Sequence, residues 1–187
     1  MIKTAVILAG GLGTRLREAV PDLPKPMVPI HNRPFLEFQL DYWIHQGITK
    51  FVLSVGYLKD SIINHFGKNY KGAQIEYIIE IQPLGTGGGL LFSASNLEET
   101  FLVLNGDTFI EVDLKSFYKF HIESESNWTL ALFKTKDFKR FLPVDIGQNG
   151  QILSLNTKQE ISSGLANGGV YLLEPSILKR FNYQSGD

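Results

Sequence analysis

The stretch TAVILAGGLG at residues 4–13 runs through apolar and β-branched side chains and then breaks into glycines. Because its apolar part does not alternate with polar residues, it is typical of a strand buried on both faces of a parallel sheet. A second stretch of this kind, TFLVLNGD at residues 100–107, ends in Asn-Gly-Asp. Ligands of open α/β sheets bind beyond the carboxyl ends of the strands, so we expect the glycines and Asp107 to share one crevice.

Helix and strand patterns alternate between these two stretches. Apolar spacing predicts strands at 51–55 and 73–80 and helices around 36–44, 62–66 and 90–97. We expect Asn32 to cap the first helix, with Pro34 near its first position and Gly47 at its end, while Gly67 ends the second. This alternation is that of an open doubly wound α/β sheet.

The pattern changes after Asp107. Asp113 is expected to cap a helix that runs to about Ile122. Strands are predicted at 128–133, 144–146, 152–155 and 168–173, and a short helix at 175–180. The short connections between these strands favour antiparallel pairing. We therefore predict an α/β fold with one domain over 1–187, a Rossmann-like doubly wound mixed sheet that is mostly parallel in 1–107 and more antiparallel in 108–187.

Composition excludes several classes of protein. The 187 residues are 43% hydrophobic and 20% charged, as in an ordinary globular chain, and no apolar run approaches the ~20 residues of a membrane-spanning helix. Basic and acidic residues, 18 and 19, nearly balance, so we expect neither a nucleic-acid partner nor a membrane partner. The absence of cysteine removes disulfides and thiolate chemistry and fits a reducing compartment. We expect a cytoplasmic location, because residues 1–9 imitate a signal peptide without a cleavage site after them.

Gly10, Gly11 and Gly13 are candidates for a loop that binds a phosphate or a nucleobase. Glycine lets backbone N–H groups approach a ligand closely. The spacing matches neither the Walker A loop nor the dinucleotide fingerprint, which argues against a dinucleotide oxidoreductase. Taken by itself, the motif is equally typical of a tight strand-to-helix turn that needs glycine for its geometry alone.

Three charged side chains favour the ligand interpretation. Arg15 follows the glycines and carries a forked donor set that matches phosphate oxygens. Lys25 lies between Pro24 and Pro26, whose restricted backbones are expected to present it from a stiff, extended arm. Asp107 is a hard oxygen ligand for Mg²⁺ carried by nucleotide phosphates. The simpler alternatives are a solvated lysine and an Asn-Gly-Asp turn.

A second glycine cluster, QPLGTGGG at residues 82–89, opens a predicted helix. The N–H groups at a helix N-terminus suit a polar or anionic group, although a flexible loop explains the same composition. The four histidines lack metal-ligand spacing, and we assign them no function.

The motifs LAGGLGTRL, PKPMVPI, RPFLEFQLDY, PLGTGGG, LNGDTF and NGGVYLL, in this order, resemble those of the sugar-1-phosphate nucleotidyltransferase family over residues 4–173. The resemblance implies the nucleotide-diphospho-sugar transferase fold and transfer of a nucleoside monophosphate from an NTP to a sugar 1-phosphate, with release of pyrophosphate. Within the family, PFLEF, PLGTGGG and NGGVYLL are most similar to D-glycero-D-manno-heptose 1-phosphate guanylyltransferases, and mannose-1-phosphate guanylyltransferases resemble the chain almost as well. GTP and the heptose phosphate are the substrates this implies, in the synthesis of a cell-surface polysaccharide.

The same resemblance implies roles for individual residues. It assigns the nucleotide to the half 1–107 and the sugar phosphate to the half 108–187. The implied catalytic residues are Arg15, Lys25 and Asp107, and Asp107 also binds Mg²⁺. The implied nucleotide-binding residues are Leu8, Ala9, Gly10, Gly11, Gly13, Thr14, Gln82 and Gly87. The implied sugar-phosphate-binding residues are Lys158 and Asn167.

The family's second metal-binding aspartate has no counterpart in the chain up to Asp187. We therefore expect a further C-terminal segment to supply it. Its absence leaves open an alternative of another class, a non-catalytic regulatory subunit that binds a nucleotide sugar. The sequence is also compatible with a homo-oligomer.

Overall fold

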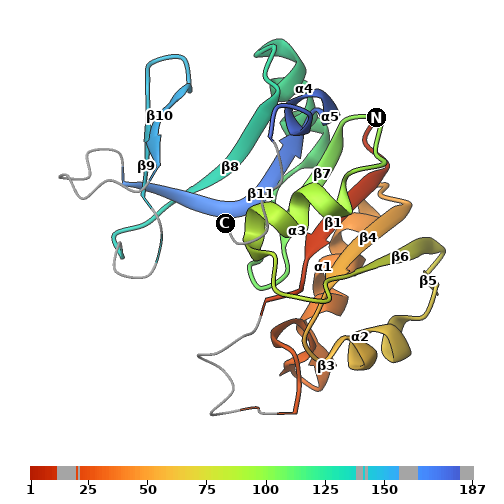
Figure 1. The fold of residues 1–187 in the computed structure, drawn as a ribbon. Helices are drawn as coiled ribbons and strands as arrows, with labels where there is room; N and C mark the ends of the chain where they lie inside the picture. The colour runs from red at the N-terminus through yellow and green to blue at the C-terminus, as the bar shows by residue number, and fades with distance from the viewer. Residues whose placement is uncertain (12–19, 21, 138–140, 142, 156–163, 182–187) are drawn as a thin grey trace.

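The computed structural model describes residues 1–11, 20, 22–137, 141, 143–155 and 164–181. The described strands of its main sheet are β1 (Thr4–Leu8), β4 (Lys50–Val55), β5 (Asn69–Tyr70), β6 (Ala73–Ile79), β7 (Phe101–Asn105), β8 (Trp128–Lys134) and β11 (Leu165–Leu173). Their order across the sheet is β5-β6-β4-β1-β7-β11-β8 (Figure 1). Strands β6, β4, β1 and β7 pair in parallel, whereas β11 is antiparallel to both β7 and β8. The prediction of a mostly parallel first half and a more antiparallel second half is confirmed.

Two hairpins accompany this sheet. Strands β2 (Pro29–Ile30) and β3 (Arg33–Pro34) form the first, and β9 (Val144–Ile146) and β10 (Ile152–Leu155) form the second. The β9–β10 hairpin stands away from the main sheet (Figure 1). Its strands lie where the sequence predicted them.

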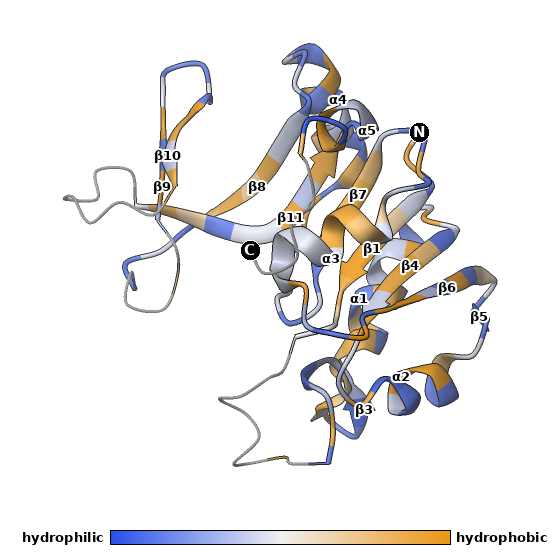
Figure 2. Ribbon diagram, in the orientation of Figure 1, coloured by the Kyte–Doolittle hydropathy of each residue, from blue (hydrophilic) through white to orange (hydrophobic). Residues whose placement is uncertain are grey.

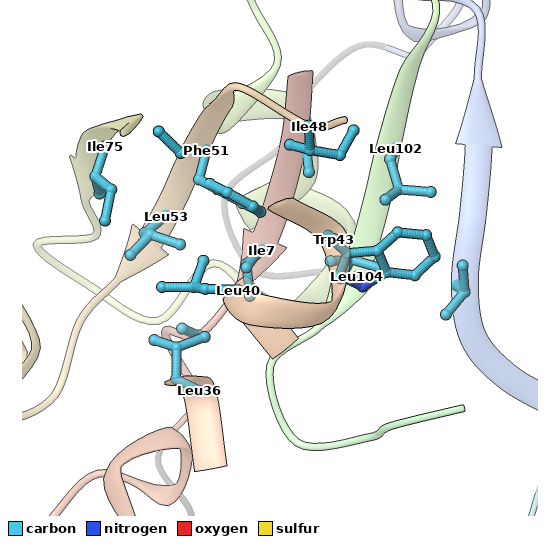
Figure 3. Close-up of a cluster of buried hydrophobic side chains, with 14 of the residues drawn as sticks. Ile7, Leu36, Leu40, Trp43, Ile48, Phe51, Leu53, Ile75, Leu102 and Leu104 are labelled. Atoms are coloured by element: carbon cyan, nitrogen blue, oxygen red, sulfur yellow. The ribbon is translucent and has the colours of Figure 1, made fainter. Parts of the chain in front are cut away.

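Helices cover both faces of the sheet. They are α1 (Phe35–His45), α2 (Lys59–Phe66), α3 (Gly85–Ser93), α4 (Leu114–Glu123) and the short α5 (Pro175–Leu178). Alternate residues of β1 face opposite sides: Ile7 packs in the cluster with Leu36, Leu40 and Trp43 of α1, and Val6 in the cluster that α3 covers. Figure 3 shows the α1 side of this core, and Figure 2 shows hydrophobic residues following the central strands. None of the helices in the described ranges is long and apolar enough to cross a membrane.

The start of α1 differs from the prediction. Asn32 does not cap the helix, because it lies with His31 in the turn of the β2–β3 hairpin. Both residues have positive φ, 48° for His31 and 64° for Asn32, as the two central residues of a type I′ turn require. The helix begins directly after Pro34, and Gly47, with a φ of 95°, follows its end as predicted.

The prediction for α3 was also wrong in its bounds. The helix occupies Gly85–Ser93 rather than 90–97, so the glycines lie within its first five residues instead of preceding it. The helix forms here although glycine has low helix propensity. Gly89 lies close to Glu80, since a Cβ at this position would lie 3.0 Å from the Glu80 carboxylate. By contrast, Asp113 caps α4 as predicted, since its side chain accepts a hydrogen bond from the backbone N–H of Ser116 at 2.8 Å.

Candidate active site

A pocket of about 540 Å³ opens at the carboxyl ends of the parallel strands. Its lining residues are Leu8, Gly10, Gly11, Glu80, Pro83, Gly85, Thr86, Gly89, Asn105 and Asp107. The register of β1 and β7 pairs Leu8 with Asn105, so the residues that follow the two strands emerge side by side. The prediction that the first glycines and Asp107 share one crevice is confirmed.

Two glycines lie at close approaches around this pocket. A Cβ on Gly10 would lie 2.3 Å from Oε1 of Glu80, and a Cβ on Gly106 would lie 2.7 Å from the backbone oxygen of Leu8. The N–H of Gly106 also donates to that Leu8 oxygen at 3.0 Å. Glycine at position 106 therefore allows the Asp107 turn to lie directly against β1.

Lys25 contacts Asp107, which lines the pocket, although 82 residues separate the two in sequence. The Lys25 ammonium group forms an ion pair with Oδ2 of Asp107, and Oδ1 of Asp107 accepts a hydrogen bond from Thr108 Oγ1 at 3.1 Å. The side chains of Lys25 and Asp107 are 39% and 41% exposed, so both can reach a ligand in the pocket.

The backbone at Lys25 is not the extended arm that the flanking prolines suggested. Residues Lys25–Met27 form a single 3₁₀ turn, in which the N–H of Met27 donates to the Pro24 oxygen at 2.8 Å. Pro26 and Met27 are buried. The backbone of Lys25 is therefore held in place by a partly buried turn rather than by an extended segment.

Glu80 is a pocket residue that the sequence analysis did not single out. It follows β6, and its Oε1 accepts a hydrogen bond from Ser54 Oγ at 2.6 Å, while its Oε2 accepts one from the backbone N–H of Leu84 at 3.2 Å. The sequence did contain a signal for this residue, because Glu80 is an acidic residue at the end of a predicted strand, as Asp107 is. The two carboxylates, Glu80 and Asp107, give the pocket acceptors from two different strands.

The second glycine cluster contributes the start of α3. Gly85 and Thr86 line the pocket, so the end of the helix whose N–H groups have no intrahelical partner lies beside it. Gln82 and Gly87 are exposed and are not among the lining residues. Their assignment to nucleotide binding stays a prediction.

Asn167 lies on β11, where the strand is irregular. Its Nδ2 donates to the Tyr171 hydroxyl at 2.9 Å, and its Oδ1 accepts from the N–H of Gly169 at 2.9 Å. Burial raises the pKa of the Tyr171 hydroxyl above its usual value. The register of β11 with β8 shifts between Asn167 and Tyr171, and Gly169 adopts a φ of 72° there. The role of Asn167 in sugar-phosphate binding stays a prediction.

The remaining residues that the sequence analysis assigned to the site fall into two groups, those at the pocket and those outside the described ranges. Leu8 lines the pocket, and Ala9 is buried beside it, with its N–H donating to the Ser54 oxygen at 2.9 Å. Four further predicted residues, Gly13, Thr14, Arg15 and Lys158, lie outside the described residues.

The described donor set fits a divalent cation that arrives with a phosphorylated ligand. Within the described ranges, no three His, Cys, Asp or Glu side chains gather into a metal-binding group. Asp107 nevertheless offers carboxylate oxygens at the pocket. Mg²⁺ commonly binds through one or two carboxylates, with phosphate oxygens and waters completing its octahedron, and one carboxylate meets that requirement.

Comparison with known proteins places the chain in a family. A family model for nucleotidyl transferases matches residues 4–186. The chain is 42% identical over 176 residues to D-glycero-alpha-D-manno-heptose 1-phosphate guanylyltransferase from Aneurinibacillus thermoaerophilus, covering 94% of this chain and 76% of the relative. It is 41% identical over 180 residues to the protein of the same name from Campylobacter jejuni, covering 96% and 80%. The crystal structure of HddC from Yersinia pseudotuberculosis complexed with GMP-PN matches with a TM-score of 0.84 at 35% identity, covering 96% of this chain and 80% of that one. This chain belongs to the nucleotidyl transferase family.

Proposed function

We propose that this chain is a sugar-1-phosphate guanylyltransferase, which transfers GMP from GTP to D-glycero-D-manno-heptose 1-phosphate and releases pyrophosphate. The observation that carries the proposal is that one pocket is lined by Asp107, Glu80 and the N-terminus of α3, and that Lys25 forms an ion pair with Asp107 there. The name of the two relatives supports the choice of guanine and heptose. Pyrophosphate release that requires both the heptose phosphate and a divalent cation tests this function.

The reaction is an in-line phosphoryl transfer. A phosphate oxygen of the sugar 1-phosphate forms a bond to the α-phosphorus of GTP, and the bond from that phosphorus to the β-phosphate oxygen breaks, so pyrophosphate leaves. No covalent intermediate with the protein is needed. The protein therefore acts by positioning the two anions and by neutralising their charge.

Lys25 and Asp107 are suited to opposite parts of this task. The ammonium group of Lys25 binds phosphate oxygens and stabilises the charge that develops on them. Asp107 would hold Mg²⁺, which would neutralise phosphate charge there. Before the nucleotide binds, the two side chains pair with each other. Since both are partly exposed, the ion pair is weak enough to exchange for ligand contacts at low cost.

Glu80 is suited to recognise guanine. Guanine presents two adjacent donors, N1–H and the N2 amino group, and a carboxylate accepts from both. Uracil and thymine offer one donor between two acceptors, whereas adenine and cytosine place a ring acceptor beside their amino group. Each Glu80 oxygen already accepts one hydrogen bond, from Ser54 or Leu84, and each retains capacity for a second. The pocket thereby favours GTP over the other nucleotides.

The Glu80→Gln variant is expected to lose its preference for GTP. It replaces one acceptor oxygen by a donor, so a charge-assisted pair of hydrogen bonds is lost and kcat/KM for GTP falls about 10- to 100-fold. The measurement compares kcat/KM for GTP, ATP and UTP at a fixed sugar-phosphate concentration. Glu76→Gln is the matched control, because Glu76 lies on β6, the strand that Glu80 follows, and pairs at 2.8 Å with Lys50, the first residue of β4. Neither Glu76 nor Lys50 lines the pocket. An unchanged GTP preference in Glu80→Gln would rule out this role.

A further inference from the structure

Gln39 lies on the buried side of α1, behind the turn that carries Asp107. Its side chain is 1% exposed, and its Nε2 donates to the backbone oxygen of Asn105 at 2.9 Å and to that of Thr108 at 2.6 Å. Asn105 and Thr108 are the first and fourth residues of the turn. The turn's own hydrogen bond, from the N–H of Thr108 to the Asn105 oxygen, is long at 3.4 Å. The two hydrogen bonds from the glutamine amide are therefore shorter than the hydrogen bond within the turn, so the amide holds the two ends of the turn together.

The orientation of the Gln39 amide follows from this contact. Both carbonyl oxygens require a donor, so the NH₂ group faces them. The amide oxygen, Oε1, is buried and has no hydrogen-bond partner in the described parts of the chain. A buried acceptor without a partner is destabilising, so the side chain is poorly explained as a device for folding stability alone.

The turn has a second anchor on its other side. The N–H of Gly106 donates to the Leu8 oxygen at 3.0 Å, which ties the turn to β1. Gln39 ties both ends of the turn to α1. Asp107 lies between these anchors, and its carboxylate points to Lys25 at the pocket. Because hydrogen bonds to β1 and to α1 hold the backbone on both sides of Asp107, they restrict the positions that its carboxylate can adopt.

We propose that Gln39 is a positioning residue for Asp107, fixing the turn so that the carboxylate meets the incoming cation and phosphates in one geometry. This inference rests on the proposed function, since the role of Asp107 does. Displacement of a reacting group by about 1 Å costs on the order of 100-fold in rate, so a residue that touches no substrate can still limit catalysis.

The test replaces Gln39 with methionine, which keeps the length of the side chain and removes both N–H donors. We expect the half-saturating Mg²⁺ concentration to rise about tenfold and kcat to fall about 10- to 100-fold, with little change in KM for the sugar phosphate. Binding of Mn²⁺ in the presence of GTP, followed by electron paramagnetic resonance without turnover, is expected to weaken to the same extent as the Mg²⁺ requirement.

Gln46→Met, at the C-cap position that directly follows α1, provides the matched control. Gln46 also binds partly buried backbone, donating to the Val112 oxygen at 3.0 Å and accepting from the Leu114 N–H at 2.6 Å, but these contacts lie beyond the turn. This variant is expected to lower the free energy of unfolding in urea while leaving Mn²⁺ binding and the Mg²⁺ requirement unchanged. Gln39→Glu, which keeps the shape of the side chain, supplies a second variant if Gln39→Met does not fold, and it too is expected to weaken Mn²⁺ binding.

The outcomes separate this inference from the proposed function. A wild-type chain without turnover contradicts the proposed function. A wild-type chain that turns over, with Gln39 variants that fold and bind Mn²⁺ as wild type does, contradicts the positioning role alone. Equal changes in the Gln39 and Gln46 variants contradict it as well, because they would reflect a general loss of stability.

Discussion

The Lys25→Ala variant is expected to lose about 100- to 1000-fold in kcat, as is typical when one preorganised charge is removed from a phosphoryl or acyl transfer site. The fold is expected to persist, because the 3₁₀ turn is held by its backbone hydrogen bond and by the buried side chains of Pro26 and Met27. Steady-state pyrophosphate release measures the effect, and urea denaturation checks the fold.

Lys50→Ala is the appropriate control for this variant. Lys50 is also a partly exposed lysine in an ion pair, with Glu76 at 2.8 Å, but Glu76 does not line the pocket, whereas Asp107, the partner of Lys25, does. The loss of Lys50 is expected to leave kcat within about twofold of wild type, since exposed ion pairs contribute little. Equal activity of Lys25→Ala and Lys50→Ala would remove Lys25 from the catalytic site.

The Asp107→Asn variant is expected to shift the Mg²⁺ titration to about 100-fold higher concentration and to lower kcat at ordinary Mg²⁺ levels. Asparagine has nearly the same shape but no negative charge, so it is a much weaker ligand for a hard cation. It also leaves Lys25 without its ion-pair partner. The measurement is pyrophosphate release as a function of Mg²⁺ concentration at saturating GTP.

Asp60→Asn controls for the loss of one negative charge on the surface. Asp60 lies on α2, its side chain is 78% exposed, and Lys59 approaches it at 3.7 Å. The Mg²⁺ titration of this variant is expected to overlay that of wild type. If the Asp107→Asn titration does so too, Asp107 is not a ligand of the cation.

Much of the fold was predictable because its signals are local. β1, β4 and β7 are mostly apolar and do not alternate with polar residues, and such stretches indicate buried parallel strands regardless of their neighbours. Asp113 caps α4 through a contact only three residues away. The start of α1 was not predictable in this way, because the type I′ turn at His31 and Asn32 competes with helix capping for the same asparagine.

The site residues that follow the ends of strands were predictable from the sequence. The residues whose role depends on contacts with distant parts of the chain were not. Asp107 and Gly10 end buried strands, and the sheet brings them together. Gln39 is one polar residue within a helix, and its burial follows from a turn 66 residues further along the chain. The position of α3 depends in the same way on Glu80, whose carboxylate lies against Gly89 and binds the Leu84 N–H just before the helix.

Pyrophosphate release by the wild-type chain tests the central claim most directly. The assay crosses GTP, CTP, UTP, ATP and dTTP with the 1-phosphates of D-glycero-D-manno-heptose, mannose and glucose, with Mg²⁺ and with a chelator. The account predicts the fastest release with GTP and the heptose phosphate, and none without Mg²⁺ or without the sugar phosphate. Retention of GTP or GDP-heptose with no pyrophosphate from any pair would contradict it and identify a nucleotide-sugar-binding protein without catalysis.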